Sequence, residues 1–253
     1  MSATEPLHRA LFSVDVEKWG DPRRKGNALA TVRTVLFNAV RESFESSGID
    51  WSACEHIHQG DGMIVVVPPE LPKSRLVDPL LDTLAGLLRR HNRQAGPATQ
   101  IRVRVALHAG EVRYDEFDLT SRAVNLLARL LDAPALRNAL ATAPETATVA
   151  VAASDSFYQD VIADGDGGID PDVYVPVTVR VKETTTRAWL HLPRHAPPAP
   201  VGAEPGPATL APAPPPADHL TPNGGRGGIH FAGPVDVRGD VVGGDKHVYG
   251  DGR

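Results

Sequence analysis

Residues 10–16 read Ala-Leu-Phe-Ser-Val-Asp-Val, an apolar run that ends in a carboxylate, Asp15. Its length and apolar content predict a buried β-strand with this acid at its end. A second carboxylate, Asp61, lies in a Gln-Gly-Asp-Gly turn between the alternating segment of residues 51–58 and the apolar run of residues 63–67. That pattern predicts a β-hairpin with an acid at its tip.

Two carboxylates on adjacent strand ends have a chemical use. A hard divalent cation such as Mg²⁺ takes oxygen ligands, commonly one or two carboxylates together with substrate phosphates. Asp15 and Asp61 would therefore bind two cations, which can clamp the attacking and leaving oxygens of a phosphoryl transfer. The alternative for either acid alone is turn chemistry, because aspartate is common at strand ends and in Gly-Asp-Gly turns.

A third segment, residues 119–131, carries leucine, valine and alanine at helical spacing. On such a helix the four-residue spacing puts Asn125 and Arg129 on one face, a turn apart. A carboxamide and a guanidinium aimed the same way can hold a ribose oxygen and a phosphate as charge moves in a transition state. The alternative is that both are solvated surface residues, and their occurrence with the upstream acids is what favours a site.

Together these segments resemble the catalytic domain of the class III nucleotidyl cyclases, the adenylate and guanylate cyclases, over about residues 8–193. The resemblance implies an α+β (mixed α/β) fold, a ferredoxin-like, class III cyclase-type sheet with helices packed on it. It implies that Asp15, Asp61 and the backbone carbonyl of Val16 bind two Mg²⁺ or Mn²⁺ ions per site. It also implies that Asn125 and Arg129 stabilise the transition state.

The same resemblance implies a set of substrate contacts. They are Asp118 and Ile57 at the two base-selecting positions, Lys18 and Trp19 in the turn that cradles phosphate, and Lys182 near the triphosphate lysine. Purine cyclases carry lysine or glutamate where this chain has Ile57, and base discrimination depends on such hydrogen bonds. An unusual nucleobase, including a pyrimidine, fits this altered set, and so does a nucleotide that is sensed rather than cyclised.

In this family two catalytic domains pair head to tail, and each site takes metals from one subunit and the asparagine and arginine from the other. The resemblance thus implies a homodimer that converts a ribonucleoside triphosphate into a 3′,5′-cyclic nucleotide and pyrophosphate. The competing hypothesis is a catalytically inactive nucleotide sensor or signalling adaptor that acts through its C-terminal tail. A hydrolase using the same acids ranks last, because the sequence shows no identifiable general base.

The remaining periodic segments complete the predicted order of elements. Helices are expected at about residues 27–46, 73–93 and 154–162, strands at 100–108 and 148–152, and a closing hairpin within 179–192. Pro134 is expected to break or restart the helix that carries Asn125. Paired strands mixed with helices covering one face indicate α+β rather than a doubly wound sheet.

Composition limits the function further. A chain of 253 residues with 42% apolar content can build one sizeable domain, and a net charge of −5 does not favour nucleic-acid binding. No apolar run approaches the roughly 18 residues needed to span a bilayer, and the first residues do not form a signal peptide. The single cysteine, Cys54, is expected to serve packing, in agreement with a reducing cytoplasm.

Beyond the predicted domain the composition changes. Residues 194–223 are rich in proline and alanine and are expected to form a disordered linker. Residues 224–253 combine Gly-Asp steps with short valine pairs, too little for a core of their own, so order is expected only through self-assembly or a protein partner. This tail is similar to those of actinobacterial signalling and conflict proteins, which implies docking or multimerisation. The alternative is a flexible tail with no role.

Overall fold

The computed structural model describes residues 5–114 and 119–198. The tail at residues 224–253, most of the predicted linker and Asp118 lie outside the described residues, so those expectations stay predictions. No helix in the described part of the chain is long and apolar enough to cross a membrane.

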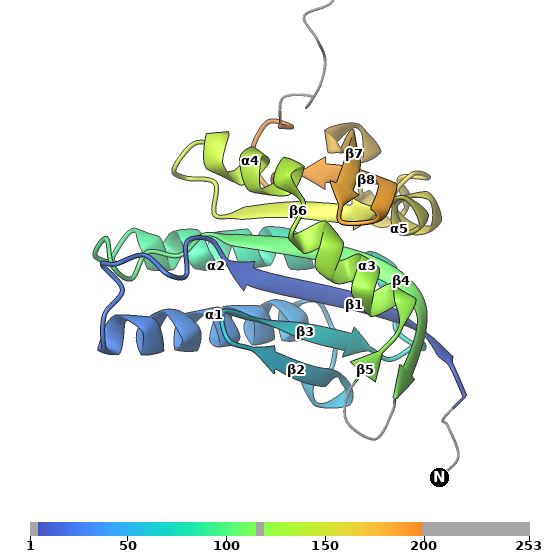
Figure 1. The fold of residues 1–253 in the computed structure, drawn as a ribbon, viewed down its shortest axis with the longest axis horizontal. Coiled ribbons are helices and arrows are strands. Elements are labelled where there is room, and N and C mark those ends of the chain that lie inside the picture. The colour runs from blue at the N-terminus through green and yellow to red at the C-terminus, as the bar shows by residue number, and fades with distance from the viewer. Residues whose placement is uncertain (1–4, 115–118, 199–253) are drawn as a thin grey trace, which may run out of the picture. The chain divides into compact units, whose positions relative to one another are not determined.

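A single mixed sheet organises the described residues (Figure 1). Its strands follow the order β2-β3-β1-β4-β6-β8-β7, and the short β5 pairs with β4. The strands are β1 (Leu7–Val16), β2 (Glu55–Gln59), β3 (Gly62–Val67), β4 (Val103–Tyr114), β5 (Leu119–Thr120), β6 (Val149–Ser154), β7 (Val175–Val181) and β8 (Thr184–His191). Only the β4–β6 pair is parallel among these ladders. The mixed α+β class predicted from the sequence is confirmed.

Helices connect the strands. They are α1 (Asn27–Ser46), α2 (Leu80–Asn92), α3 (Arg122–Leu131), α4 (Pro134–Thr142) and α5 (Asp155–Val161). Short 3₁₀ turns occupy Trp51–Ala53, Lys73–Leu76, Asp166–Gly168 and Pro171–Val173. Pro134 stands at the first position of α4, where its missing N–H costs nothing, so the predicted restart of the chain at this proline is confirmed.

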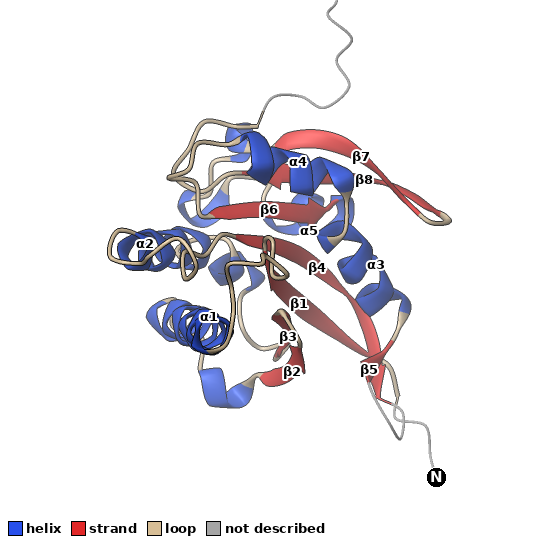
Figure 2. Cartoon of the chain, turned by 60° about the vertical axis from the view of Figure 1, so that its left-hand side comes forward, coloured by secondary structure: helices blue, strands red, loops and turns tan. Residues whose placement is uncertain are grey.

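The expectation that helices cover one face of the sheet is wrong. Alternate residues of β1 enter different cores: Phe12 and Val14 join the cluster under α1 and α2, whereas Leu11 joins the cluster under α3 and α4. Figure 2 shows α1 and α2 on one side of the sheet and α3 on the other. Since β4 and β6 are parallel, the chain must cross over between them, and α3 and α4 make that crossover on the second face.

Two predicted boundaries also need correction. The helix expected over residues 73–93 is a 3₁₀ turn followed by α2, because Pro79 has no N–H to donate and disfavours helical backbone at Asp78. The hairpin strand expected from residue 51 begins only at Glu55, because Asp50 accepts hydrogen bonds from the backbone N–H and hydroxyl of Ser52 and holds a 3₁₀ turn there.

Candidate active site

The backbone places the two predicted metal acids side by side. In the β1–β3 ladder Asp15 lies opposite Gly62, and the Val16 N–H donates to the Asp61 carbonyl at 3.1 Å. A Cβ atom on Gly62 would lie 2.0 Å from the Val14 carbonyl oxygen, so only glycine fits at this close approach. The hairpin turn is therefore seated directly on the end of β1, and it brings Asp61 to Asp15 and to the Val16 backbone.

Asp15 already holds a counterion in this structure. Arg104 of β4 donates to both of its carboxylate oxygens, from Nε at 2.8 Å and from Nη2 at 2.6 Å. Their side chains are only 12% and 13% exposed, so water screens this pair little. Burial raises the pKa of Asp15 and the neighbouring Asp61 adds to that rise, while Arg104 opposes it.

A second charged pair continues the row just past the paired ends of β1 and β4. Glu17 lies beyond Asp15, and its carboxylate is 3.7 Å from Nε of Arg102. Arg102 also donates to the Leu140 carbonyl of α4, which confirms that this row faces α3 and α4. Sequence reasoning overlooked both arginines, although an Arg-Val-Arg-Val sequence in a buried strand puts two cations on one face and signals buried counter-charges.

A cavity of about 230 Å³ opens beside this charged row. Its lining carries the cations Lys18, Arg23, Arg24 and Arg102 and the acids Glu17, Asp21 and Glu145. Buried nitrogens of two of these arginines, Nη1 of Arg24 and Nε of Arg102, have no hydrogen-bond partner among the described residues. Such unpaired donors favour an anion or another acceptor in the cavity.

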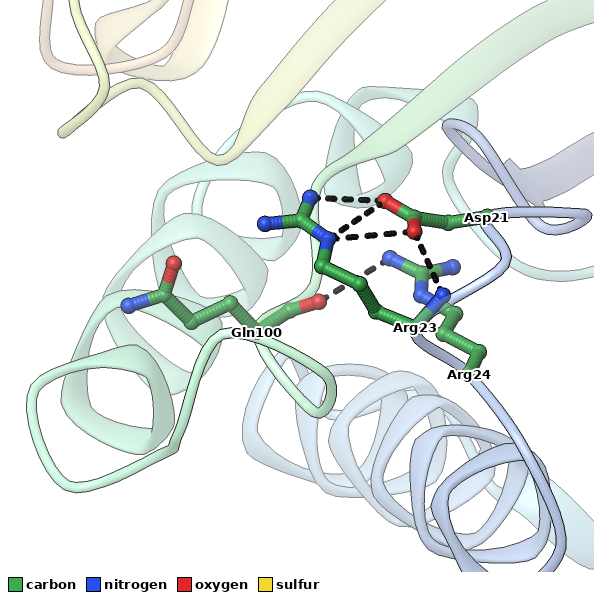
Figure 3. A network of polar contacts seen from close by, with 4 residues as sticks. All are labelled: Asp21, Arg23, Arg24 and Gln100. Atoms are coloured by element: carbon green, nitrogen blue, oxygen red, sulfur yellow. Dashed lines mark hydrogen bonds and ion pairs between the residues drawn. The ribbon is translucent and has the colours of Figure 1, made fainter.

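The loop that forms one wall of this cavity is held by its own ion pairs (Figure 3). Asp21 accepts from Nε and Nη2 of Arg23, and Arg24 donates from Nη2 to the Gln100 carbonyl at 3.0 Å. Pairing with Arg23 lowers the pKa of Asp21. Lys18 begins the loop with φ at 53°, a conformation that glycine adopts more easily than lysine.

The helix with the predicted transition-state residues starts where Ser121 caps it. The Ser121 hydroxyl accepts from the Val124 N–H at 3.2 Å, so α3 begins at Arg122. Asn125 is exposed, whereas the Arg129 side chain is only 19% exposed. Arg129 donates to Glu183 and Thr184 and, at 3.4 Å, to the Val181 carbonyl. Its guanidinium is thus held by the β7–β8 turn of its own chain.

The predicted substrate residues fall in different surroundings. Lys182 lies in the β7–β8 turn with φ at 51°, next to the Glu183 that holds Arg129. Ile57 is half-buried on β2 against the core under α3 and α4, and Trp19 packs against the core under α1 and α2. The structure therefore brings Lys182 together with Arg129 and Lys18 together with the cationic cavity. The contacts assigned to Ile57, Trp19 and Asp118 stay predictions.

The acid pair suits a hard cation that is shared with a substrate. In the described ranges, no group of three or more histidine, cysteine, aspartate or glutamate side chains could hold a metal ion by itself. Asp15 and Asp61 offer carboxylates on neighbouring strand ends, and Mg²⁺ characteristically completes such a set with water and substrate phosphates. The donor set fits Mg²⁺ or Mn²⁺, and the guanidinium of Arg104 shows that positive charge is stabilised at Asp15.

A buried histidine farther along the same face of β4 predicts a pH effect on stability. Burial lowers the pKa of His108 to about 4, and its Nδ1 lies 2.8 Å from the Ser154 hydroxyl. In the unfolded chain the histidine takes up a proton near pH 6.5, whereas in the folded protein it stays neutral down to about pH 4. The contribution of neutral His108 to the free energy of unfolding is therefore complete above pH 6.5 and is lost as the pH falls to about 4. Urea unfolding should show that the wild-type protein loses on the order of 3 kcal/mol more stability over that range than His108→Gln does. Identical pH profiles for the two proteins would contradict this assignment.

Comparison with known proteins identifies the fold. No protein-family model and no curated protein matches the chain. An adenylate/guanylate cyclase/hydrolase from Silicibacter pomeroyi superposes with a TM-score of 0.53 at 15% identity, covering 76% of this chain and 100% of its own. The guanylyl cyclase Cya2 gives 0.52 at 17% identity, covering 78% and 100%. A bacterial light-regulated adenylyl cyclase gives 0.51 at 12% identity, covering 75% and 52%. The chain therefore has the fold of the adenylate and guanylate cyclase catalytic domains.

Proposed function

We propose that this chain is a nucleotidyl cyclase that converts a ribonucleoside triphosphate into a 3′,5′-cyclic nucleotide and pyrophosphate. The observation that carries this proposal is the seating of the Asp61 turn on the end of β1, which brings Asp61 to Asp15 in a fold shared with cyclase domains. Asn125 and Arg129 occupy successive turns of α3, as a transition-state pair requires.

The acids would hold two Mg²⁺ or Mn²⁺ ions between them. When bound, such ions acidify the ribose 3′-hydroxyl and neutralise charge on the triphosphate. Asp15 and Asp61 would orient the α-phosphate against that hydroxyl, and the Val16 carbonyl would add an oxygen ligand. Arg104 balances the charge of Asp15 before loading, so the pair keeps a buried carboxylate from standing alone.

The anionic leaving group has a matching environment. The cavity lined by Lys18, Arg23, Arg24 and Arg102 lies next to Glu17, two residues beyond Asp15 on the same strand face. Its unpaired guanidinium N–H groups would donate hydrogen bonds to oxygens of the outer phosphates, which become pyrophosphate as the ring closes. The proposal thus assigns this cavity to the end of the triphosphate and the Asp15 region to the reacting phosphate.

A homodimer would complete each site. Lys182 lies in the β7–β8 turn that binds Arg129, and the described hydrogen bonds of Arg129 run to that turn rather than to Asp15 or Asp61 of its own chain. In the proposed head-to-tail dimer, Asn125 and Arg129 of one protomer face the acids of its partner, and Arg129 takes the charge that develops on the α-phosphate.

A four-nucleotide assay tests the proposal. Purified full-length protein is incubated with each ribonucleoside triphosphate and Mn²⁺, and cyclic nucleotide and pyrophosphate are measured. One or more triphosphates should give both products in equal amounts. Because Ile57 offers an apolar side chain at a base-selecting position, the preferred base is expected to differ from the usual purine pattern. Absence of cyclic product with all four triphosphates would contradict cyclase activity.

The second candidate is a nucleotide sensor without turnover. Two ion pairs favour it: Asp15 is paired with Arg104, and Arg129 is paired with Glu183 inside the same chain. Such pairs would keep Asp15 from binding a cation and Arg129 from contacting the α-phosphate, while the cationic cavity still binds a triphosphate. Saturable triphosphate binding without cyclic product in the four-nucleotide assay would favour this candidate.

A further inference from the structure

A second cavity lies on the other side of the sheet. It measures about 200 Å³ and is formed by the start of α2, the loop that leads into β7 and the end of β8. Its polar lining consists of Asp78, Asp82, Asp170, Tyr174, His191 and Arg194. Tyr174 and Leu81 belong to the core that α1 and α2 cover, whereas Asp15 faces α3 and α4. This cavity is therefore separate from the candidate active site.

Two polar atoms on its wall lack hydrogen-bond partners. The hydroxyl of Tyr174 and Nδ1 of His191 are buried and bond to nothing among the described residues. Tyr174 is only 5% exposed, and the two rings lie 4.7 Å apart between centroids. Because an unsatisfied buried polar group costs about 1–3 kcal/mol, two on neighbouring residues of one cavity wall favour a further hydrogen-bond partner there.

The groups on the wall are mainly acceptors. Asp78, Asp82 and Asp170 contribute three carboxylates against the single guanidinium of Arg194, which leaves an excess of two negative charges. Burial lowers the pKa of His191, so its ring is neutral at pH 7 and its free nitrogen can accept. Burial, followed by the charge of Asp82, raises the pKa of Tyr174, so its phenol keeps its proton.

Arg194 shows that the carboxylates at this cavity can bind a cation. Its Nε lies 3.3 Å from the Asp82 carboxylate, and its guanidinium rests against Gly86, where a Cβ atom would already touch it at 3.6 Å. This contact occupies the Asp82 carboxylate, and one oxygen of Asp170 accepts from the Asp172 N–H at 3.0 Å, which leaves its other oxygen open. Asp78 is exposed, and its carboxylate accepts no hydrogen bond from another described residue. A second cation therefore finds free acceptors beside the first.

We propose that this cavity binds a small organic cation with several N–H donors, of the guanidine or alkylamine class. Its charged group pairs with the carboxylates of Asp78 and Asp170, and its N–H groups reach the Tyr174 hydroxyl and the free nitrogen of His191. Val77, Leu81, Ile169 and Val173 enclose a short alkyl portion. The site is independent of the proposed cyclase activity, since it shares no residue with the acid pair or with α3.

Calorimetric titration of the full-length protein with agmatine, a short alkylamine with a guanidinium group, tests this inference. Agmatine should bind saturably, and the neutral analogue n-butylurea should not. Tyr174→Phe should weaken agmatine binding roughly tenfold, because it removes one hydrogen bond to a charged ligand. The same substitution should leave thermal stability of the free protein unchanged or raised, because the lost hydroxyl had no partner.

Matched variants locate the binding. Asp78→Asn should weaken agmatine binding, whereas Asp166→Asn, which removes an exposed acid of the neighbouring turn outside the cavity, should not. Absence of agmatine binding would overturn the inference. Equal binding of n-butylurea would overturn the assignment of a cation, and binding that Tyr174→Phe and Asp78→Asn leave unchanged would overturn the assignment to this cavity.

Discussion

Replacing Asp61 by alanine is expected to reduce cyclic nucleotide formation by roughly a hundredfold to a thousandfold while leaving the fold intact. The reason is that Asp61 is one of two carboxylates proposed to hold the cations, and losing a group that stabilises transition-state charge commonly costs 10²–10³-fold. Asp61 makes no ion pair with any described side chain, so its removal leaves no buried charge behind. Turnover is measured with the preferred triphosphate and Mn²⁺, and folding by thermal unfolding.

Asp15 should respond differently in stability, although turnover is lost equally. Asp15→Ala leaves the largely buried Arg104 without its carboxylate, which should destabilise the protein by about 3 kcal/mol. Asp15→Asn keeps one acceptor oxygen for Arg104 and should remain nearer to wild-type stability. Substantial activity in Asp61→Ala or Asp15→Asn would remove the two-metal assignment.

The acid pair could be predicted because its determinants are local. An apolar run that ends in Asp15 and a Gly-Asp-Gly turn before another apolar run each signal their own element. The register Asp15↔Gly62 then confirms that these elements meet. The same local logic found α1, whose apolar residues recur at helical spacing over Asn27–Ser46.

The partners of these residues could not be predicted, because they depend on strand pairing over long sequence separations. Arg104 reaches Asp15 across 89 residues, and only the β1–β4 register shows that they are opposite each other. Arg129 reaches Glu183 across 54 residues through the packing of α3 beside the β7–β8 turn. The presence of helices on both faces of the sheet was not predicted for a related reason. Neither strand sequence alone indicates that β4 and β6 pair in parallel.

For catalysis, Arg129 would have to leave its ion pair with Glu183 and bind phosphate instead. Glu183 is 74% exposed, so the pair is accessible at the surface and contributes little to stability. A triphosphate with bound cations offers Arg129 a more highly charged partner than one carboxylate. The guanidinium would then exchange Glu183 for phosphate at small cost, with α3 unchanged.

The central claim is that each site combines the acids of one protomer with Asn125 and Arg129 of its partner, and mixing two inactive variants tests it. Asp61→Ala and Arg129→Ala chains should each be inactive, but their heterodimer would hold one intact site in which the acids come from one chain and the arginine from the other. Random pairing of equal amounts makes half of the dimers heterodimers with one good site of two, so about a quarter of wild-type activity should return.

A mixture of Asp61→Ala with Asp15→Asn provides the matched control, because every site in that heterodimer lacks a metal acid. The decisive measurement is cyclic nucleotide formation by heterodimers isolated with two different affinity tags. Activity restored in the Asp61→Ala and Arg129→Ala heterodimer but absent in the control is the result that the shared-site account predicts. No activity in the isolated Asp61→Ala and Arg129→Ala heterodimer, from variants that fold and pair normally, would contradict it.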